Sequence, residues 1–372
     1  MNYPQAVAYV LGFANYEAGD ATRARYREFN LERVRALLSL LGDPDRGLTI
    51  VHVAGTKGKG STTAMIAAAV AKAGFRTGRY TSPHLHTIRE RIAVDGEPVS
   101  EGDFARAAAA IAPAVAEVNK VGRYGQLTTF EVLTALALWH FRAAGATHAV
   151  LEVGMGGRLD ATNVVTPAVS VITNISLDHT EVLGETIAEI AGEKAAIIKR
   201  GVPVVMGPQP PEAGRVIARR AYEEQAPLTA VGAGVRWKAG DFDDAGQWLH
   251  VDTARAFYDV RIPLLGVHQM ENAAAAVAAC EALAAAGTVM PRQAIMDGLA
   301  GVRWPGRLET LGRSPQVVVD GAHNPHSMAR LAEAVQRHFA CERKIIVFGA
   351  MRTKKLAEMA REVARMKPAL AA

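Results

Sequence analysis

The stretch Leu48-Thr-Ile-Val-His-Val-Ala-Gly-Thr-Lys-Gly-Lys-Gly-Ser-Thr62 predicts how this chain folds. Its first half is a short apolar run, which indicates a buried β-strand, and its second half is a glycine loop. An Ala-rich amphipathic helix is predicted to follow over residues 61–73. Because a strand, a glycine loop and a helix in this order open an α/β fold, the sequence predicts a parallel sheet with this loop at the end of its first strand.

The glycine loop has the composition of a phosphate-binding loop. Glycines let several backbone N–H groups face one anion, and the start of the next helix adds a positive dipole. Lys59 supplies a point charge, and Ser61 or Thr62 supplies a hydroxyl group for magnesium. The strict Walker spacing is not met, since an extra glycine, Gly60, precedes the hydroxyl group. The alternative interpretation is a tight strand–helix turn that binds nothing.

The same alternation of strands and helices continues along the chain. The hydrophobic pattern predicts that the first 48 residues are largely helical, with further helices over 105–118, 129–144, 187–199 and 271–286, strands over 148–153, 168–173 and 202–205, and a small β meander over 228–263. Trp304-Pro-Gly-Arg307 is a rigid break, after which the pattern restarts with a strand (316–320), a helix (325–339), a strand (344–349) and a helix (356–366). We therefore expect an ATPase domain over 1–300 and a second domain over 301–372.

Composition excludes several classes of protein. With 372 residues, 49% of them hydrophobic and 21% charged, the chain is long and apolar enough to bury a core and is not disordered. No apolar run approaches the roughly 18 residues of a membrane span, and the N-terminus has no signal-peptide pattern. Two cysteines exclude a disulfide framework and a zinc cluster, which suits the cytoplasm. A net charge of +5 fits anionic small molecules at least as well as nucleic acid, and we expect neither nucleic acid nor a membrane as a partner.

Eight motifs, in order, resemble the folylpolyglutamate synthase/dihydrofolate synthase branch of the Mur ligase family. The motifs are Val53-Ala-Gly-Thr-Lys-Gly-Lys-Gly-Ser61, Tyr80-Thr-Ser-Pro-His-Leu85, Leu151-Glu-Val-Gly-Met-Gly-Gly-Arg-Leu-Asp-Ala-Thr-Asn163, Leu177-Asp-His-Thr180, Gly192-Glu-Lys-Ala-Ala196, Asn272-Ala-Ala274, Trp304-Pro-Gly-Arg-Leu308 and Asp320-Gly-Ala-His-Asn-Pro325. The resemblance as a whole runs from about residue 29 to residue 349. The fold that this resemblance implies is a P-loop parallel-sheet ATPase domain followed by a smaller, incomplete Rossmann-like domain.

The resemblance implies an ATP-dependent ligase. A folate or dihydropteroate carboxylate would attack the γ-phosphate of ATP to form an acyl phosphate, and the amine of L-glutamate would then displace phosphate. Because these substrates are all anions, the site must neutralise charge and hold the reacting groups in line. The partners are thus small molecules, Mg²⁺ is required, and we expect a monomer.

The resemblance also assigns roles to individual residues. The residues implied to bind ATP are Gly55, Thr56, Gly58, Lys59, Gly60, Ser61, Thr62, Asn272, Arg307 and Asp320. The implied magnesium ligands are Ser82, Glu152 and His179. Glu152 also follows an apolar strand, where α/β sheets place their ligand sites, and its oxygens suit magnesium. His323 is expected to face the cleft near glutamate.

Lys194 lies within an otherwise apolar helical face, so burial should depress its pKa and leave part of its amine neutral. A neutral lysine can take up carbon dioxide to form a carbamate, and the family uses a lysine in this motif in that way. We therefore expect a carboxylated lysine at position 194, which joins Lys59 and His323 as a catalytic residue.

On the pteroate side, Leu159, Asp160 and Ala161 resemble the version of the motif found in enzymes that bind dihydropteroate as well as folates, and Thr128 and Phe130 form the other implied segment. This favours a bifunctional enzyme.

Each candidate also has a purely structural interpretation. These interpretations are a cap of the following glycine turn for Glu152, a turn serine for Ser82, a loop histidine for His179, a lysine that reaches solvent beside Glu193 for Lys194, helix caps for Asn272 and Asp320, a surface linker residue for Arg307, and an apolar helix face for Phe130.

The chain departs from the family pattern at two places. Lys57 stands where the family usually has asparagine, and Arg352-Thr-Lys-Lys355 replaces an Asp-Lys-Asp-like turn near a second domain that is short for the family. Two rival functions remain at this point: another Mur-type ligase acting on a peptidoglycan precursor, or a non-catalytic nucleotide-binding protein.

Overall fold

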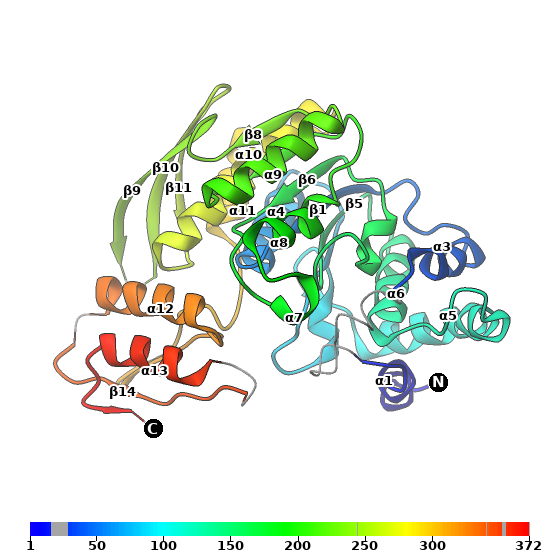
Figure 1. The fold of residues 1–372 in the computed structure, drawn as a ribbon, viewed down its shortest axis with the longest axis horizontal. Helices are drawn as coiled ribbons and strands as arrows, with labels where there is room; N and C mark the ends of the chain where they lie inside the picture. Colours follow the sequence, from blue (N-terminus) through cyan, green and yellow to red (C-terminus); the bar gives the residue numbers. More distant parts are fainter. Residues whose placement is uncertain (16–28, 244, 340, 352–354, 372) are drawn as a thin grey trace.

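The structure is a computed structural model that describes residues 1–15, 29–243, 245–339, 341–351 and 355–371 (Figure 1). Its centre is an eight-stranded sheet in the order β4-β3-β2-β5-β1-β6-β7-β8. The strands from β2 to β8 in that order are parallel, and β3 and β4 extend one edge as antiparallel strands. Their bounds are β1 (Thr49–Ala54), β2 (Thr77–Tyr80), β3 (Ile92–Val94), β4 (Glu97–Pro98), β5 (His148–Glu152), β6 (Val169–Ile172), β7 (Val204–Met206) and β8 (Leu228–Ala230). The predicted parallel sheet is confirmed.

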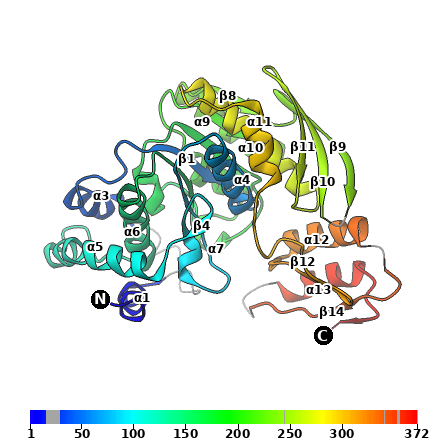
Figure 2. The ribbon, with the colours of Figure 1, turned by 180° about the vertical axis from the view of Figure 1, so that it is seen from behind.

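Helices cover both faces of this sheet, which is why its central strands are almost continuously apolar. On one face lie α4 (Lys59–Lys72), α10 (Val267–Ala285) and α11 (Arg292–Ala300) (Figure 2). On the other face lie α1 (Tyr3–Leu11), α3 (Leu31–Leu40), α5 (Glu101–Val121), α6 (Thr129–Ala143), α8 (Ile187–Ala195) and α9 (Pro211–Glu223). No helix in the described part of the chain is both long enough and apolar enough to cross a membrane.

The predicted β meander divides between two sheets. Residues 228–230 form β8 and pair in parallel with β7 in the main sheet, whereas β9 (Val235–Asp243), β10 (Gly246–Thr253) and β11 (Phe257–Ile262) form a separate antiparallel sheet packed against α10 and α11. Short connecting helices are η1 (Ile88–Arg91), η2 (Ala161–Val164) and α7 (Thr180–Leu183). The sequence pattern did not predict α9, α11 or the edge strands β3 and β4, and the predicted helix over 187–199 ends earlier, at Ala195.

The C-terminal part lies beside the ends of β9 and β10 in both views (Figures 1 and 2). It contains a β-hairpin of β12 (Glu309–Arg313) and β13 (Gln316–Val319), then α12 (Pro325–His338), β14 (Ile345–Ile346), α13 (Leu356–Arg365) and β15 (Leu370–Ala371). The predicted strand over 344–349 is too long. Only two of its residues, those of β14, pair with β15, and they do so in parallel. A small apolar core of Met328, Ala332, Met359, Val363 and Met366 joins the two helices.

Two predicted stretches fall partly outside the described residues. The N-terminal helical prediction is confirmed for α1 and α3, but residues 16–28 between them are not described. Residues 352–354, which belong to the departure from the family pattern near the C-terminal end, are not described either.

The helix α11 packs unusually close to α4. A Cβ atom at Gly298 would lie only 2.3 Å from the Cα atom of Ala69, so the two backbones are in direct contact there. Even a methyl group at position 298 would require one helix to shift.

Candidate active site

The glycine loop lies at the carboxyl end of β1, the side of an open α/β sheet on which ligands bind. Gly58 caps α4 in the left-handed region (φ +86°), and a Cβ atom there would lie 2.2 Å from Oδ1 of Asn272. The loop is held against the end of β6, because the backbone N–H of Thr56 donates to the carbonyl of Asn174 (2.8 Å) and the hydroxyl of Thr173 donates to the carbonyl of Lys57 (2.7 Å). Positions 55 and 58 therefore both require glycine: a Cβ atom at Gly58 would clash with Asn272, and one at Gly55 (φ +152°) would clash with Thr173.

Lys59, Ser82 and Glu152 come together in the structure, as the sequence predicted. Nζ of Lys59 lies 4.0 Å from Oε1 of Glu152, and the backbone N–H of Ser82 donates to Oε2 of Glu152 (3.2 Å). These residues come from three different segments: Lys59 and Ser82 follow β1 and β2, and Glu152 is the last residue of β5. The Glu152 carboxylate therefore binds across the sheet edge and does not cap the glycine turn that follows it.

Burial dominates the electrostatics of Glu152, whose side chain is 5% exposed. Burial raises the pKa of this carboxyl group, and the nearby Lys59 ammonium group opposes that rise. A buried carboxylate is stabilised by further positive charge, so the site favours a cation or a cationic side chain beside Glu152.

Lys194 is buried (4% exposed) on α8, so the interpretation that it reaches solvent beside Glu193 is wrong. Burial, followed by repulsion from Lys59, lowers the pKa of its amine to about 7. The loop after β5 packs on the same turn, since a Cβ at Gly157 would lie 3.1 Å from the Cα of Lys194. The side chain is thus buried among charged groups of both signs, and its neutral amine is accessible near neutral pH.

Asp178 links the phosphate loop to the C-terminal part. It accepts a hydrogen bond from Nζ of Lys57 (2.7 Å) and another from Nδ2 of Asn324 (3.2 Å). Asn324 also caps α12, so the predicted alternative of Asp320 as that cap is wrong. The next residue, His179, has a left-handed backbone (φ +50°) and caps the short helix α7.

The other predicted residues of the C-terminal part surround the linker. Asp320 accepts backbone hydrogen bonds from Leu308 (3.0 Å) and Ala322 (2.8 Å); burial raises its pKa and Arg307 opposes the rise. His323 is exposed, and its Nδ1 lies 2.8 Å from the carbonyl oxygen of Gly321.

Asn272 is not a helix cap, because α10 begins at Val267 and Gly266 caps it. It lies in the second turn, where its Nδ2 donates to Oε1 of Gln269 (3.0 Å) and its Oδ1 contacts the Gly58 backbone. The structure therefore brings Asn272 against the phosphate loop, while Ser61 and Thr62 are buried in the first turn of α4.

The residues predicted on the pteroate side form a separate group near the start of α6. Thr128 caps α6, and its hydroxyl group donates to Glu131 (2.9 Å), which forms a buried ion pair with Arg33. Phe130 lies within ring-contact distance of Tyr80 (5.7 Å between centroids) and closes over Gly154.

The loop after β5 supplies the rest of that group. Asp160 caps η2 and accepts hydrogen bonds from the backbone N–H groups of Met155 and Thr162 (3.0 Å each), while Leu159 is half-buried and Ala161 buried. The polar side-chain atoms of Thr128 and Asp160 therefore hydrogen-bond within the protein, at the starts of α6 and η2. Contact of these residues with a ligand stays a prediction.

A cavity of about 400 Å³ lies between the main sheet and α12. It is lined by Asn174, Ile175, Ser176, Leu177, Ile187, Pro208, Gln209, Pro210, Glu271, His326 and Arg330. Oδ1 of Asn174 and Oγ of Ser176 are buried without a hydrogen-bond partner in the structure. Neither residue is predicted from the sequence, although their position between a predicted strand and the Leu177-Asp-His-Thr180 motif is a signal.

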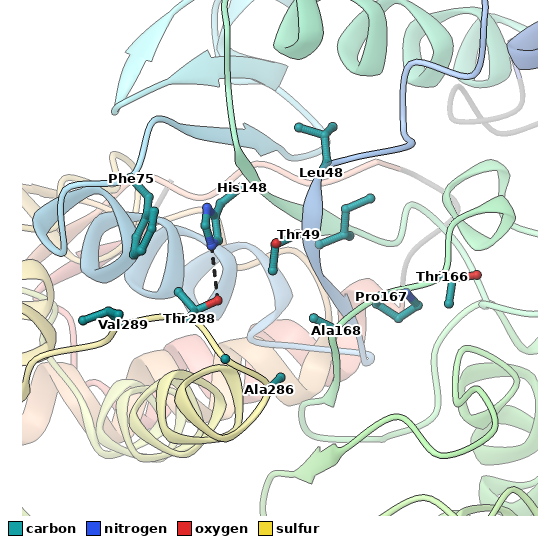
Figure 3. Close-up of a pocket in the computed structure, with 12 residues that line it drawn as sticks. Leu48, Thr49, Phe75, His148, Thr166, Pro167, Ala168, Ala286, Thr288 and Val289 are labelled. Atoms are coloured by element: carbon teal, nitrogen blue, oxygen red, sulfur yellow. Dashed lines mark hydrogen bonds between the residues drawn. The ribbon is translucent and has the colours of Figure 1, made fainter.

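A second cavity, of about 510 Å³, is not part of this site (Figure 3). It lies at the amino ends of β1, β5 and β6, the opposite edge of the sheet. Both ring nitrogens of His148 are already within hydrogen-bond distance of threonine hydroxyl groups, those of Thr147 (3.0 Å) and Thr288 (3.2 Å), so they are not available to a ligand there.

The predicted magnesium ligands fit the ion in their chemistry. Burial raises the pKa of the Glu152 carboxyl group although Lys59 opposes the rise, and Ser82, whose backbone already contacts Glu152, adds a hydroxyl oxygen of the kind that magnesium prefers. Within the described residues no three His, Cys, Asp or Glu side chains gather as a metal cluster, so protein side chains of these types do not form a closed cage there.

Comparison with known proteins agrees with this geometry. Residues 53–280 match the model of the Mur ligase middle domain, and residues 306–371 match that of the Mur ligase, glutamate ligase domain. A dihydrofolate synthase/folylpolyglutamate synthase of Bacillus subtilis is 39% identical over 332 residues, covering 88% of this chain and 77% of its own length.

Two solved structures are also similar. The apo form of the Lacticaseibacillus casei enzyme FPGS has a TM-score of 0.90 at 33% identity, covering 100% of this chain and 87% of its own. An FPGS–AMPPCP–folate complex also has a TM-score of 0.90, at 34% identity, covering 100% of this chain and 89% of its own.

Proposed function

Since the chain belongs to the Mur ligase family, in the folylpolyglutamate synthase/dihydrofolate synthase branch, we propose that it joins L-glutamate to the carboxylate of a folate or of dihydropteroate with hydrolysis of ATP to ADP and phosphate. The observation that carries the proposal is the contact of Lys59 with the buried Glu152 at the carboxyl end of the sheet. The two family matches, 53–280 and 306–371, support a division into domains 1–300 and 301–372.

The triphosphate is proposed to lie on the loop from Gly55 to Thr62, with Lys59 and the N-terminus of α4 holding its charge. Glu152, Ser82 and His179 would hold Mg²⁺, which neutralises phosphate charge during transfer. Arg307 reaches this region from the linker, since its charge acts on Glu152. The arrangement supplies what an encounter of two anions requires: positive charge and alignment.

Two bond changes complete the reaction. The substrate carboxylate oxygen bonds to the γ-phosphorus as the bond to ADP breaks, which gives an acyl phosphate. The neutral amine of glutamate then bonds to the acyl carbon, phosphate leaves, and the amine releases one proton. His323, in the exposed loop before α12, is proposed to lie on the glutamate side.

Lys194 is proposed to act as a carbamate. Its neutral amine attacks carbon dioxide, a C–N bond forms, and one proton is released, so that a buried neutral amine becomes a buried carbamate anion. The pKa of about 7 supports this step, because a substantial fraction of the amine is neutral near neutral pH. The carbamate would then add oxygen ligands beside the phosphate loop.

The nucleoside is proposed to occupy the 400 Å³ cavity, where Asn174 and Ser176 present polar atoms without partners. We expect Asn174→Ala to raise KM for ATP about tenfold with kcat within about twofold, because one hydrogen bond to the base is worth about 1 kcal/mol or slightly more. Steady-state kinetics in ATP measure this. A matched control is Gln293→Ala on the exposed face of α11. An unchanged KM for Asn174→Ala would contradict the proposal that the base binds in this cavity.

A substrate panel tests the function as a whole. ATP is supplied with L-glutamate and, in turn, dihydropteroate, a tetrahydrofolate or a UDP-muramoyl peptide precursor, and phosphate release is followed. We expect glutamate-dependent release with tetrahydrofolate, and with dihydropteroate if the enzyme is bifunctional. Release with the UDP-muramoyl substrate alone, or AMPPCP binding with no turnover on any substrate, would contradict the proposal.

The exposed Cys341 and the buried Cys280 are both free thiols, which supports the proposal of a reducing, cytoplasmic location.

A further inference from the structure

The indole ring of Trp304 rests on the backbone of the phosphate loop. A Cβ atom at Gly60 would lie 2.7 Å from Cζ2 of Trp304 and 3.4 Å from Oε2 of Glu152. The ring edge of a residue near the start of the proposed second domain therefore contacts the first turn of α4, beside the carboxylate that faces Lys59. Only glycine leaves room for this contact, which explains the extra glycine that breaks the Walker spacing.

Arg79 supports the ring from the sheet. Its guanidinium carbon lies 5.0 Å from the centroid of the Trp304 ring, a cation–π distance, and Arg79 is the third residue of β2. Nε of Arg79 and Nε1 of Trp304 are both buried without a hydrogen-bond partner in the structure. The ring is thus held by packing and by the guanidinium charge.

The same stretch of chain carries Arg307. Its Nη1 donates to the carbonyl of Gly306 (3.0 Å) and would lie 2.5 Å from a Cβ atom at Gly321, so the guanidinium group has little freedom. Gly306 in turn fits against Leu85, where a Cβ would lie 3.1 Å from Cδ1 of that leucine. Trp304 and Gly306 therefore both fix the linker against the main sheet, and Gly306 directly precedes Arg307.

We propose that Trp304, held between Gly60 and Arg79, is a positioning residue that sets the place of Arg307 relative to the phosphate loop. This inference rests on the proposed function, in which Arg307 binds the phosphates. It predicts that the effect of Trp304 on turnover passes through Arg307, so that removing both residues costs no more than removing Arg307 alone.

A double-mutant cycle tests this coupling. Trp304→Ala, Arg307→Ala and the double variant are compared in kcat and in KM for ATP during glutamate-dependent phosphate release. We expect Trp304→Ala to lower kcat about 30-fold, within the range for a catalytic group misplaced by about 1 Å. The double variant should match Arg307→Ala within about twofold. Trp304→Phe should retain at least a third of wild-type kcat, and Arg79→Leu should lose about fivefold because the ring loses its support.

Trp248→Ala is the matched control, because this tryptophan lies exposed on the outer strands far from the phosphate loop and should leave kcat unchanged. Thermal unfolding is measured for each variant to detect a failure to fold. If Trp304→Ala does not fold, the kcat values of Trp304→Phe and Arg79→Leu test the positioning role instead. Additive losses in the cycle, or a wild-type kcat for Trp304→Ala, would overturn the inference. If the wild type itself shows no turnover, the proposed function fails separately, and the same cycle in AMPPCP affinity decides whether the two residues are coupled.

Discussion

Replacement of Lys194 by alanine is expected to abolish glutamate-dependent phosphate release, with a loss of at least about 10³-fold in kcat/KM, or about 4 kcal/mol. The proposed carbamate is the only role that needs this amine to be neutral, and alanine removes the amine altogether. Lys194→Arg should be equally inactive and should not recover in excess bicarbonate, because a guanidinium group stays charged and does not take up carbon dioxide.

The pH dependence of the wild type follows from the same residue. Its pKa of about 7 lies below that of an ordinary lysine because burial and Lys59 disfavour the ammonium form. As the pH rises through 7 the neutral amine becomes the major form and carboxylation is favoured, whereas below 7 the amine is protonated and cannot react. We therefore expect activity to fall on the acidic side of pH 7, and bicarbonate to restore CO₂-depleted enzyme better at pH 8 than at pH 6.

Lys199→Ala is the matched control, since Lys199 follows the same helix and its Nζ is bonded to Oδ1 of Asn163 (2.7 Å) instead of facing the phosphate loop. It should keep at least a third of wild-type activity. An NMR signal from ¹³C-bicarbonate that is present in the wild type and missing in Lys194→Arg would identify the carbamate directly. Near-wild-type turnover of Lys194→Ala or Lys194→Arg would rule out this role.

The second large effect is expected for Lys59→Ala, which should lower kcat/KM for ATP about 10³-fold, or about 4 kcal/mol. This change removes the charge at the start of α4 that is proposed to hold the phosphates. It also removes a cation close to Glu152, so the rise in the pKa of Glu152 caused by burial is opposed only by the Ser82 hydrogen bond and the charge of Arg307. Because Glu152 then takes up its proton at a higher pH, the acidic limb of the remaining activity should move to higher pH.

Lys57→Asn gives the matched control two residues away. Lys57 is paired with Asp178, which also accepts a hydrogen bond from Asn324 and so keeps one partner in the variant. We expect no more than about a threefold change in kcat/KM. If Lys59→Ala behaved like Lys57→Asn, the loop would not be the phosphate site.

The parallel sheet and the phosphate loop were predictable because local sequence decides them. Apolar runs of four to six residues bounded by glycines indicate buried strands, and Gly58 and Lys59 fall on the loop and helix start that the pattern indicated. Burial of Lys194 was predictable for the same reason, since its neighbours on α8 are apolar.

The contacts between distant segments were not predictable from local sequence. Nothing in the residues around Gly60 indicates that Trp304, more than 200 positions later, occupies the space beside it. The division of the meander was missed because residues 228–230 have no pattern of their own that distinguishes a parallel edge strand from a hairpin strand. The short strand β14 was overestimated because its apolar run extends beyond the two residues that find a partner.

The close contact between Gly298 and Ala69 has a mechanical consequence. It fixes the end of α11 on α4 just before the linker, and Trp304 fixes the linker on the first turn of the same helix. The chain from 298 to 304 is therefore anchored to one rigid body at both ends. Because Gly306 also fits against Leu85, any rotation of the C-terminal part must be absorbed beyond this anchored stretch, after Gly306.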